Sequence, residues 1–183
     1  MKILAISDTH GKLNRVRDIF GKLRDIDLII HAGDHYLDAE AIEDEFHIPV
    51  VTVKGNCDSG SGAKDYEIIE AECGSILVTH GHRYDVNYSL RNLMYLAEEH
   101  NCIAAVFGHT HCALVDEYDG IHFINPGSLT LPRDGSGGTY AIIRTTEDSF
   151  EASIVYYTTV MGSSKKKPQS GFLRGLIQYS DRF

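Results

Sequence analysis

The chain has 183 residues, of which 43% are hydrophobic and 23% charged, and its formal net charge is −9. This length and composition place it among soluble globular proteins with a sizeable core. The acidic balance argues against general binding to nucleic acid or to anionic membranes, both of which need a basic surface. No apolar run approaches the length of a membrane-spanning helix, so no membrane association is expected.

The four cysteines form no C-x-x-C pair, so the sequence does not favour a structural zinc site or a disulfide framework. The apolar run near the start is too short for a signal peptide and is typical of a strand. We therefore expect a cytoplasmic protein with reduced thiols.

The first part of the chain alternates apolar strand-like runs with segments in which apolar residues recur every three or four positions. We predict strands at residues 2–7, 27–30 and 49–53 and helices at residues 13–23 and 36–46. This βαβαβ order is typical of a parallel sheet covered by helices.

In the later part of the chain, most of the predicted strands form hairpins. We predict strands at residues 66–71, 75–79, 103–107, 113–118, 121–124, 140–145 and 152–157, and a helix at residues 87–100. Asp119-Gly120 is a strong two-residue hairpin signal. Such a chain forms two packed sheets flanked by helices, or one mixed sheet. We place one domain at residues 1–160 and a linker with a C-terminal arm at residues 161–183.

Five successive elements end in residues that commonly bind metals: Asp8 and His10, Asp34, Asn56 and Asp58, His80 and His82, and His109 and His111. Each one alone is weak evidence, since polar residues and glycine are common in turns. Ligands usually bind at the carboxyl ends of strands in α/β folds, so five such ends indicate one site. In an extended segment the imidazoles of His109 and His111 would point the same way. The mixed oxygen and nitrogen donors suit Mn, Fe, Zn, Co or Ni.

The five blocks resemble, in order, those of the calcineurin-like metallophosphoesterases. The matching segments are Asp8-x-His10, Gly33-Asp34, Gly55-Asn56-x-Asp58, His80-Gly81-His82 and Gly108-His109-x-His111. The length and the Gly-Asn-Cys-Asp variant are similar to the small single-domain YfcE-type phosphodiesterases. The resemblance covers about residues 1–158 and implies an α/β fold, a four-layer αββα sandwich of two facing mixed sheets flanked by helices.

The resemblance also implies roles. Asp8, His10 and His111 would hold a first divalent metal, Asn56, His80 and His109 a second, and Asp34 would bridge them. Manganese is the first expectation for the two ions. A metal-bridging hydroxide would attack phosphorus directly, without a phospho-enzyme intermediate. Asp34, Asn56, Cys57, Asp58 and His80 form the expected catalytic set.

Cys57 departs from the larger family, where many members carry a histidine that contacts substrate and can protonate the leaving oxygen. A thiol is a poorer acid there, which predicts slow turnover biased toward good leaving groups. Asp58 would orient a neighbouring group, and a plain turn carboxylate is nearly as good an interpretation.

Substrate contacts are expected from Asn56, Cys57, His82 and Arg133. For His82, facing water is an equal alternative, and a lone loop arginine such as Arg133 is usually just solvated.

The leading hypothesis is a two-metal phosphodiesterase acting on a small phosphodiester. A phosphomonoesterase or a nuclease could use the same site, although the acidic charge argues against a nuclease that grips long polyanions. The alternative from another class is a protein-binding scaffold, as in a retromer subunit of the same fold whose ligand positions are substituted. A homodimer or higher oligomer is left open.

Overall fold

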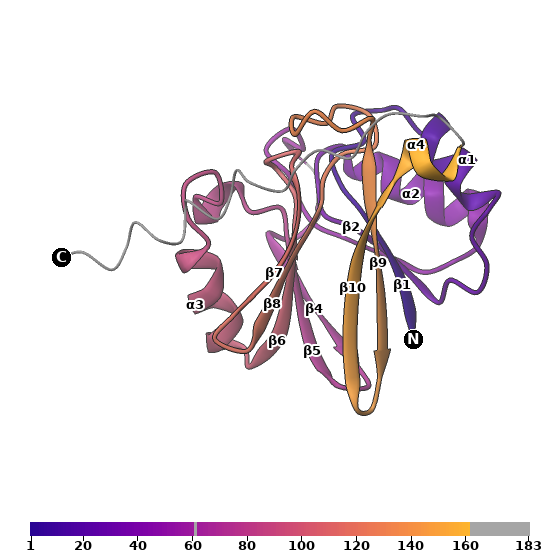
Figure 1. The fold of residues 1–183 in the computed structure, drawn as a ribbon. Helices are drawn as coiled ribbons and strands as arrows, with labels where there is room; N and C mark the ends of the chain where they lie inside the picture. Colours follow the sequence, from indigo (N-terminus) through magenta and orange to yellow (C-terminus); the bar gives the residue numbers. More distant parts are fainter. Residues whose placement is uncertain (61, 162–183) are drawn as a thin grey trace.

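The computed structural model describes residues 1–60 and 62–161. Its first sheet has five strands (Figure 1). Their order across the sheet is β10 (Ser149–Tyr156), β9 (Thr139–Thr146), β1 (Lys2–Ile6), β2 (Leu28–His31) and β3 (Val50–Thr52). β1, β2 and β3 are parallel, as the βαβαβ order predicts, and the β9–β10 hairpin adds antiparallel strands beside β1.

The second sheet also has five strands. Their order is β4 (Tyr66–Ala71), β5 (Gly74–Thr79), β6 (Cys102–Phe107), β8 (Ile121–Pro126) and β7 (Ala113–Tyr118). β5, β6 and β8 run parallel, while β4 and β7 are antiparallel edge strands. The predicted hairpin turn joins β7 to β8, with φ of 50° at Asp119 and 77° at Gly120, as a primed turn requires.

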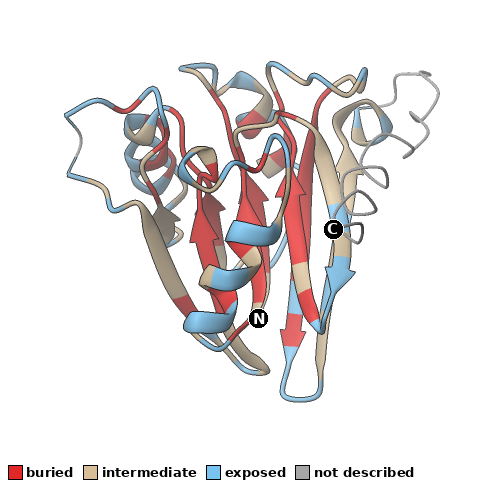
Figure 2. Cartoon of the chain, turned by 90° about the vertical axis from the view of Figure 1, so that its left-hand side faces the viewer, coloured by how far each residue is buried: buried red, intermediate tan, exposed pale blue. Residues whose placement is uncertain are grey.

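Helices cover the outer face of each sheet, which confirms the predicted four layers. α1 (Asn14–Phe20), α2 (Tyr36–Phe46) and the short α4 (Tyr157–Val160) lie on the first sheet, and α3 (Arg91–Glu99) lies on the second (Figure 1). β1 shows how sequence builds the layers. Ile3 and Ala5 point toward the other sheet, whereas Leu4 and Ile6 face the helices. Both faces of β1 are buried, so its sequence is almost continuously apolar (Figure 2).

Two helices are shorter than the apolar spacing predicts. α1 ends before Gly21, a poor helix former, while Leu23 still packs on the same core from outside the helix. The helix predicted at residues 87–100 begins only at Arg91. Before it, a 3-10 turn at His82–Tyr84 and a left-handed Asp85 lead into a turn that brings the N–H of Tyr88 to the carbonyl of Asp85.

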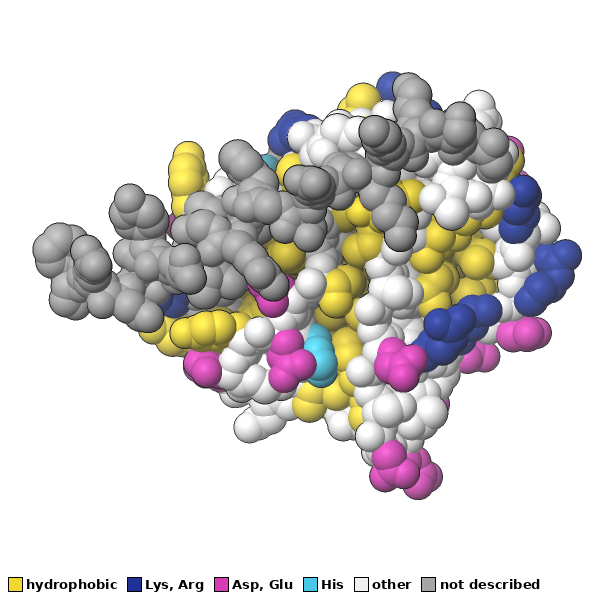
Figure 3. All heavy atoms as spheres, in the orientation of Figure 1, with side chains coloured by type: hydrophobic (Ala, Val, Ile, Leu, Met, Phe, Trp, Pro, Cys, Tyr) yellow, Lys and Arg dark blue, Asp and Glu magenta, His cyan; other side chains and the backbone are white. Residues whose placement is uncertain are grey.

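β7 and β10, one edge strand from each sheet, lie side by side (Figure 1). On the face that they form, apolar side chains show between strands and charged groups of both signs surround them (Figure 3). Val115 and Tyr118 of β7 are among the apolar residues exposed to solvent. Among the residues that the structure describes, none of the helices has the length and apolar character needed to cross a membrane. Apart from Met161, the predicted linker and arm lie outside the described residues.

Candidate metal centre

The five predicted loops meet at one edge of the two sheets. Each follows the carboxyl end of a strand, namely β1, β2, β3, β5 or β6. Backbone hydrogen bonds join neighbouring loops: the N–H of Asp8 donates to the carbonyl of Gly33 at 3.1 Å, and the N–H of Gly108 donates to the carbonyl of His80 at 3.2 Å. The site is therefore part of the strand framework.

The first group of ligand atoms comes from the loops after β1 and β6. Nε2 of His111 lies 3.2 Å from Oδ1 of Asp8 and 3.4 Å from Nε2 of His10. The rings of His10 and His111 are stacked with centroids 5.2 Å apart. Asp8 is fully buried, and its Oδ1 makes no hydrogen bond among the described residues. A buried, unsatisfied carboxylate oxygen is costly unless a cation fills the space beside it.

The second group surrounds the amide oxygen of Asn56, in the loop after β3. This Oδ1 lies 3.1 Å from Nε2 of His80 and 2.9 Å from Nδ1 of His109. The rings of His80 and His109 are in edge-to-face contact, with centroids 5.2 Å apart. The two imidazoles and the amide thus converge from three different loops.

Asp34 lies between the two groups. Its Oδ1 is 3.5 Å from Nε2 of His80, and its Oδ2 is 3.8 Å from Nε2 of His10. The side chain is only 3% exposed, and each oxygen faces a histidine of the site. A carboxylate that presents one oxygen to each of two ligand groups has the geometry of a bridging ligand.

The chemistry of the donors fits metal ions. Nδ1 of His80 lies 2.7 Å from the carbonyl of Ala32, and Nδ1 of His111 lies 2.7 Å from the carbonyl of Leu131. A carbonyl only accepts hydrogen bonds, so Nδ1 carries the proton in both rings, and the neutral form of each ring directs a lone pair on Nε2 into the site. Backbone anchoring of this kind is usual for histidines that bind metal.

Strained backbone accompanies the site. Six non-glycine residues of these loops have left-handed φ between 49° and 70°: Asp8, His10, Asp34, His35, His109 and His111. Such conformations cost energy and concentrate at functional sites. They correct the expectation for the last loop. His109 and His111 do not lie in an extended segment, and their rings point to different ligand groups.

Two glycines allow the loops to approach one another. A Cβ on Gly55 would lie 2.1 Å from Oδ1 of Asp34, and one on Gly108 would lie 2.0 Å from Oγ of Ser7 and 2.9 Å from Oδ2 of Asp8. Neither position leaves room for a side chain. Close approach of one loop to another therefore requires glycine at both positions.

The buried charges influence one another. Burial works to lower the pKa of His111, but the adjacent Asp8 carboxylate outweighs it and raises that pKa. Burial likewise works to raise the pKa of Asp8, and the rings of His111 and His80 together hold it below its ordinary value. In His10 and His109 burial prevails and lowers the pKa. These two rings favour the neutral form that binds metal.

Cys57 and Asp58 follow Asn56 and have different surroundings. The backbone N–H of Cys57 donates to Oδ1 of Asp34 at 2.8 Å, and its exposed thiol lies beside the first ligand group. Partial desolvation of the sulfur and the nearby Asp34 raise the pKa of the thiol to about 11. The carboxylate of Asp58 instead accepts the N–H groups of His35, Tyr36 and Gly55 at 2.8–2.9 Å. Asp58 therefore joins the loops after β2 and β3.

The two remaining predicted substrate contacts lie at the margin of the site. The ring of His82 is 5.3 Å from that of His80, and its Nδ1 is buried and without a hydrogen bond among the described residues. Arg133 is exposed and close enough for its charge to oppose protonation of His109 and His111. Its backbone N–H donates to the carbonyl of His111 at 3.0 Å.

Three residues support the site through side-chain contacts that the sequence does not predict. Asn125 donates to the carbonyl of Gly108 at 2.8 Å, and Ser128 donates to the carbonyl of Asp8 at 2.9 Å. Asn87 contacts Nε2 of His109 at 2.8 Å. The Asn-Pro-Gly-Ser segment was a usable signal for the first two, but nothing in the sequence distinguishes Asn87.

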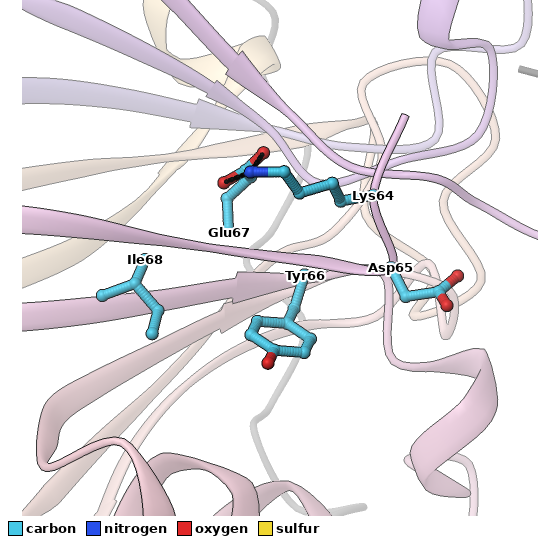
Figure 4. Close-up of a pocket in the computed structure, with 5 residues that line it drawn as sticks. All are labelled: Lys64, Asp65, Tyr66, Glu67 and Ile68. Atoms are coloured by element: carbon cyan, nitrogen blue, oxygen red, sulfur yellow. Dashed lines mark hydrogen bonds and ion pairs between the residues drawn. The ribbon is translucent and has the colours of Figure 1, made fainter. Parts of the chain in front are cut away.

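A hollow of about 590 Å³ lies elsewhere, along the edge strand β4 (Figure 4). It is lined by residues 64–68, of which Lys64 and Glu67 form an ion pair at 2.9 Å. None of the lining residues belongs to the two ligand groups. The hollow therefore adds nothing to the site described above.

Comparison with known proteins agrees with this geometry. Residues 1–148 match the calcineurin-like phosphoesterase superfamily domain. The chain is 38% identical over 160 residues to the probable metallophosphoesterase YsnB of Bacillus subtilis, covering 86% of this chain and 90% of that one. It is 27% identical over 168 residues to phosphodiesterase YfcE of Escherichia coli K12, covering 78% and 87%. A crystal structure of a predicted phosphoesterase from Streptococcus pneumoniae TIGR4 is similar, with a TM-score of 0.73, 28% identity and coverage of 85% and 89%. The chain belongs to the calcineurin-like phosphoesterase superfamily.

Proposed function

We propose that this protein is a dinuclear metal-dependent phosphodiesterase. The observation that carries the proposal is the placement of Asp34, whose two carboxylate oxygens face His80 on one side and His10 on the other. A site for one ion would not need a carboxylate shared by two complete donor groups. The family and the name of the relative YfcE support the same reaction class.

In this proposal each of the two groups of ligand atoms binds one metal ion. The first ion is held by Asp8, His10 and His111, the second by Asn56, His80 and His109, and both by Asp34. When bound, a pair of divalent ions activates water and neutralises charge on the phosphoryl group. Backbone groups of the chain orient these donors. The carbonyl of Ala32 holds the ring of His80, and the carbonyl of Leu131 holds the ring of His111, without any bound ion. Manganese is the first choice for this donor set, and Ni, Zn, Fe or Co would also be accepted.

Cys57 favours a diester with a good leaving group. Its thiol lies among the donors but has a pKa of about 11, which makes it a weak general acid near neutral pH. His82 and Arg133 stand at the margin, where a phosphate oxygen or an ester substituent would enter.

The substrate that we propose is small. The net charge of −9 disfavours a nuclease that grips long polyanions. On the face shown in Figure 3, the visible basic side chains lie mainly along the right-hand margin, with a few at the top and left. The four cysteines are free, which fits a reducing compartment such as the cytoplasm. A homodimer or higher oligomer is compatible with this function.

The test begins with metal-free protein. Mn²⁺, Ni²⁺ or Zn²⁺ is added singly, and hydrolysis of a chromogenic bis-aryl phosphate is measured beside the matching monoester. Asp34→Asn serves as the site control. We expect metal-dependent diester cleavage that Asp34→Asn loses. Faster monoester cleavage would instead establish a phosphomonoesterase.

The scaffold alternative has its own outcome in the same experiment. Stoichiometric binding of metal without cleavage of either ester would overturn the enzymatic proposal. The protein would then be a binding module that retains its metal ligands.

A further inference from the structure

Three histidines of the centre face Asp8 or Asn56, namely His80, His109 and His111, and their outer ring nitrogens have two kinds of partner. His80 and His111 direct Nε2 into the site, and each has its Nδ1 on a backbone carbonyl at 2.7 Å. His109 is reversed. Its Nδ1 faces Asn56 at 2.9 Å, while its outer nitrogen, Nε2, lies 2.8 Å from Nδ2 of Asn87. One candidate ligand is thus held from behind by a side chain.

That side chain comes from an exposed turn. Asn87 lies between the 3-10 turn at His82–Tyr84 and α3, and both Asn87 and Tyr88 are exposed to solvent. A left-handed Asp85 and the hydrogen bond from the N–H of Tyr88 to its carbonyl set the course of this turn. The partners behind His80 and His111 are instead backbone carbonyls, of the buried Ala32 and of the exposed Leu131, and a side-chain substitution leaves both in place. The support of His109 is a side chain, so a single substitution can remove it.

We propose that Asn87 is a positioning residue that sets the affinity of the second metal ion through His109. This inference rests on the proposed dinuclear function. Without metal, the amide donates from Nδ2 to Nε2, so the neutral imidazole carries its proton on Nδ1 and donates it to Asn56. Binding of an ion at Nδ1 requires the proton to be on Nε2. With the proton on Nε2, the amide of Asn87 would rotate to present its oxygen and accept a hydrogen bond from that N–H.

An asparagine suits this exchange because its amide has a donor on one side and an acceptor on the other. Alanine offers neither, and it would leave the ring of His109 free to turn away from Asn56. Aspartate offers only acceptors, which match the metal-bound tautomer of His109. Losing such an outer partner typically lowers metal affinity by about 10–100-fold.

The test compares Asn87→Ala, Asn87→Asp and the control Asn92→Ala, which removes another exposed asparagine from the neighbouring helix. Titration calorimetry of metal-free protein with Mn²⁺ should show two binding events in the wild type. We expect Asn87→Ala to weaken one event by about 10–100-fold and to leave the other unchanged. Asn87→Asp should restore the weakened event, and Asn92→Ala should behave as the wild type.

A second readout follows the proton itself. Long-range ¹H–¹⁵N NMR of the histidine rings should report the Nδ1–H tautomer of His109 in metal-free protein and the Nε2–H tautomer with Zn²⁺ bound. Two unchanged binding events in Asn87→Ala would overturn the role of Asn87 and leave the dinuclear centre intact. A single event in the wild type would instead contradict the proposed function.

Discussion

The backbone N–H of Cys57 donates a 2.8 Å hydrogen bond to Oδ1 of Asp34. This bond fixes Cys57 beside the carboxylate that lies between the two ligand groups. Cys57, at the position where the resemblance leads one to expect a histidine, is therefore held beside the candidate metal centre by its own backbone. A substitution there changes the side chain without removing the contact that positions it.

We expect Cys57→His to broaden the range of leaving groups. An imidazole titrates near neutral pH, whereas the pKa of the Cys57 thiol is raised to about 11, so histidine can protonate a poor leaving group and cysteine cannot. General acid catalysis contributes about 10²–10⁴-fold, and this gain should be confined to alkyl esters. The measurement is kcat/KM for a series of diesters of increasing leaving-group pKa. An unchanged dependence on leaving group would contradict the account, with Cys57→Ala as the control.

Asp58→Asn should loosen two loops at once. The carboxylate accepts three backbone N–H groups, and these bonds lower its pKa although burial opposes them. An amide retains one acceptor oxygen, so we expect a loss of about 1–3 kcal/mol in the free energy of unfolding and weaker metal binding. Because the folded pKa is depressed, the stabilisation is present at neutral pH and is lost as the pH falls through the folded value. Urea unfolding tests this, and the exposed Asp44→Asn on α2 should have little effect.

Gly55→Ala should displace the central carboxylate. The added methyl would lie 2.1 Å from Oδ1 and 2.3 Å from the backbone nitrogen of Asp34, so one of the two loops must move. Forced overpacking of this kind costs about 1–3 kcal/mol. Thermal unfolding and metal titration measure the effect. Gly62→Ala is a matched control, because nothing lies within 4 Å of its Cβ position. Equal behaviour of the two variants would show that the loops are not tightly packed.

His31 should make the fold sensitive to acid. It is fully buried, and burial lowers its pKa to about 4 although Asp38 and other carboxylates oppose the shift. Between the ordinary value of 6.5 and about 4, the unfolded chain binds a proton that the folded chain does not. As the pH is lowered from 6.5 to about 4, the free energy of unfolding therefore decreases. This one group accounts for a decrease of about 3 kcal/mol.

The measurement is the free energy of unfolding at several pH values between 7 and 4. His31→Gln should show a shallower loss than the wild type. His47→Gln, at an exposed helix end, should keep the wild-type slope. Identical slopes in all three proteins would mean that His31 is protonated in the folded state.

The sequence by itself determined which strands form and which polar residues gather at one edge of the sheets. Continuous apolar runs such as residues 2–7 predict strands buried on both faces, and the polar residues that follow them fall at one sheet edge because parallel strands share their carboxyl ends. All seven predicted ligands lie together, from Asp8 to His111. Local periodicity was less reliable at helix ends: α1 ends before Gly21, and α3 begins at Arg91 and not at residue 87.

Only the tertiary structure decided in which direction the side chains of the candidate ligands point. Left-handed backbone at His109 and His111 separates two rings that an extended segment would align. The contact between Asn87 and His109 joins residues 22 positions apart, and no local pattern in the sequence records it. Strand periodicity and turn chemistry act over a few residues, whereas the direction of a metal ligand depends on packing between loops from two sheets. For that reason the candidate ligands can be predicted from the sequence, but their orientation and support cannot.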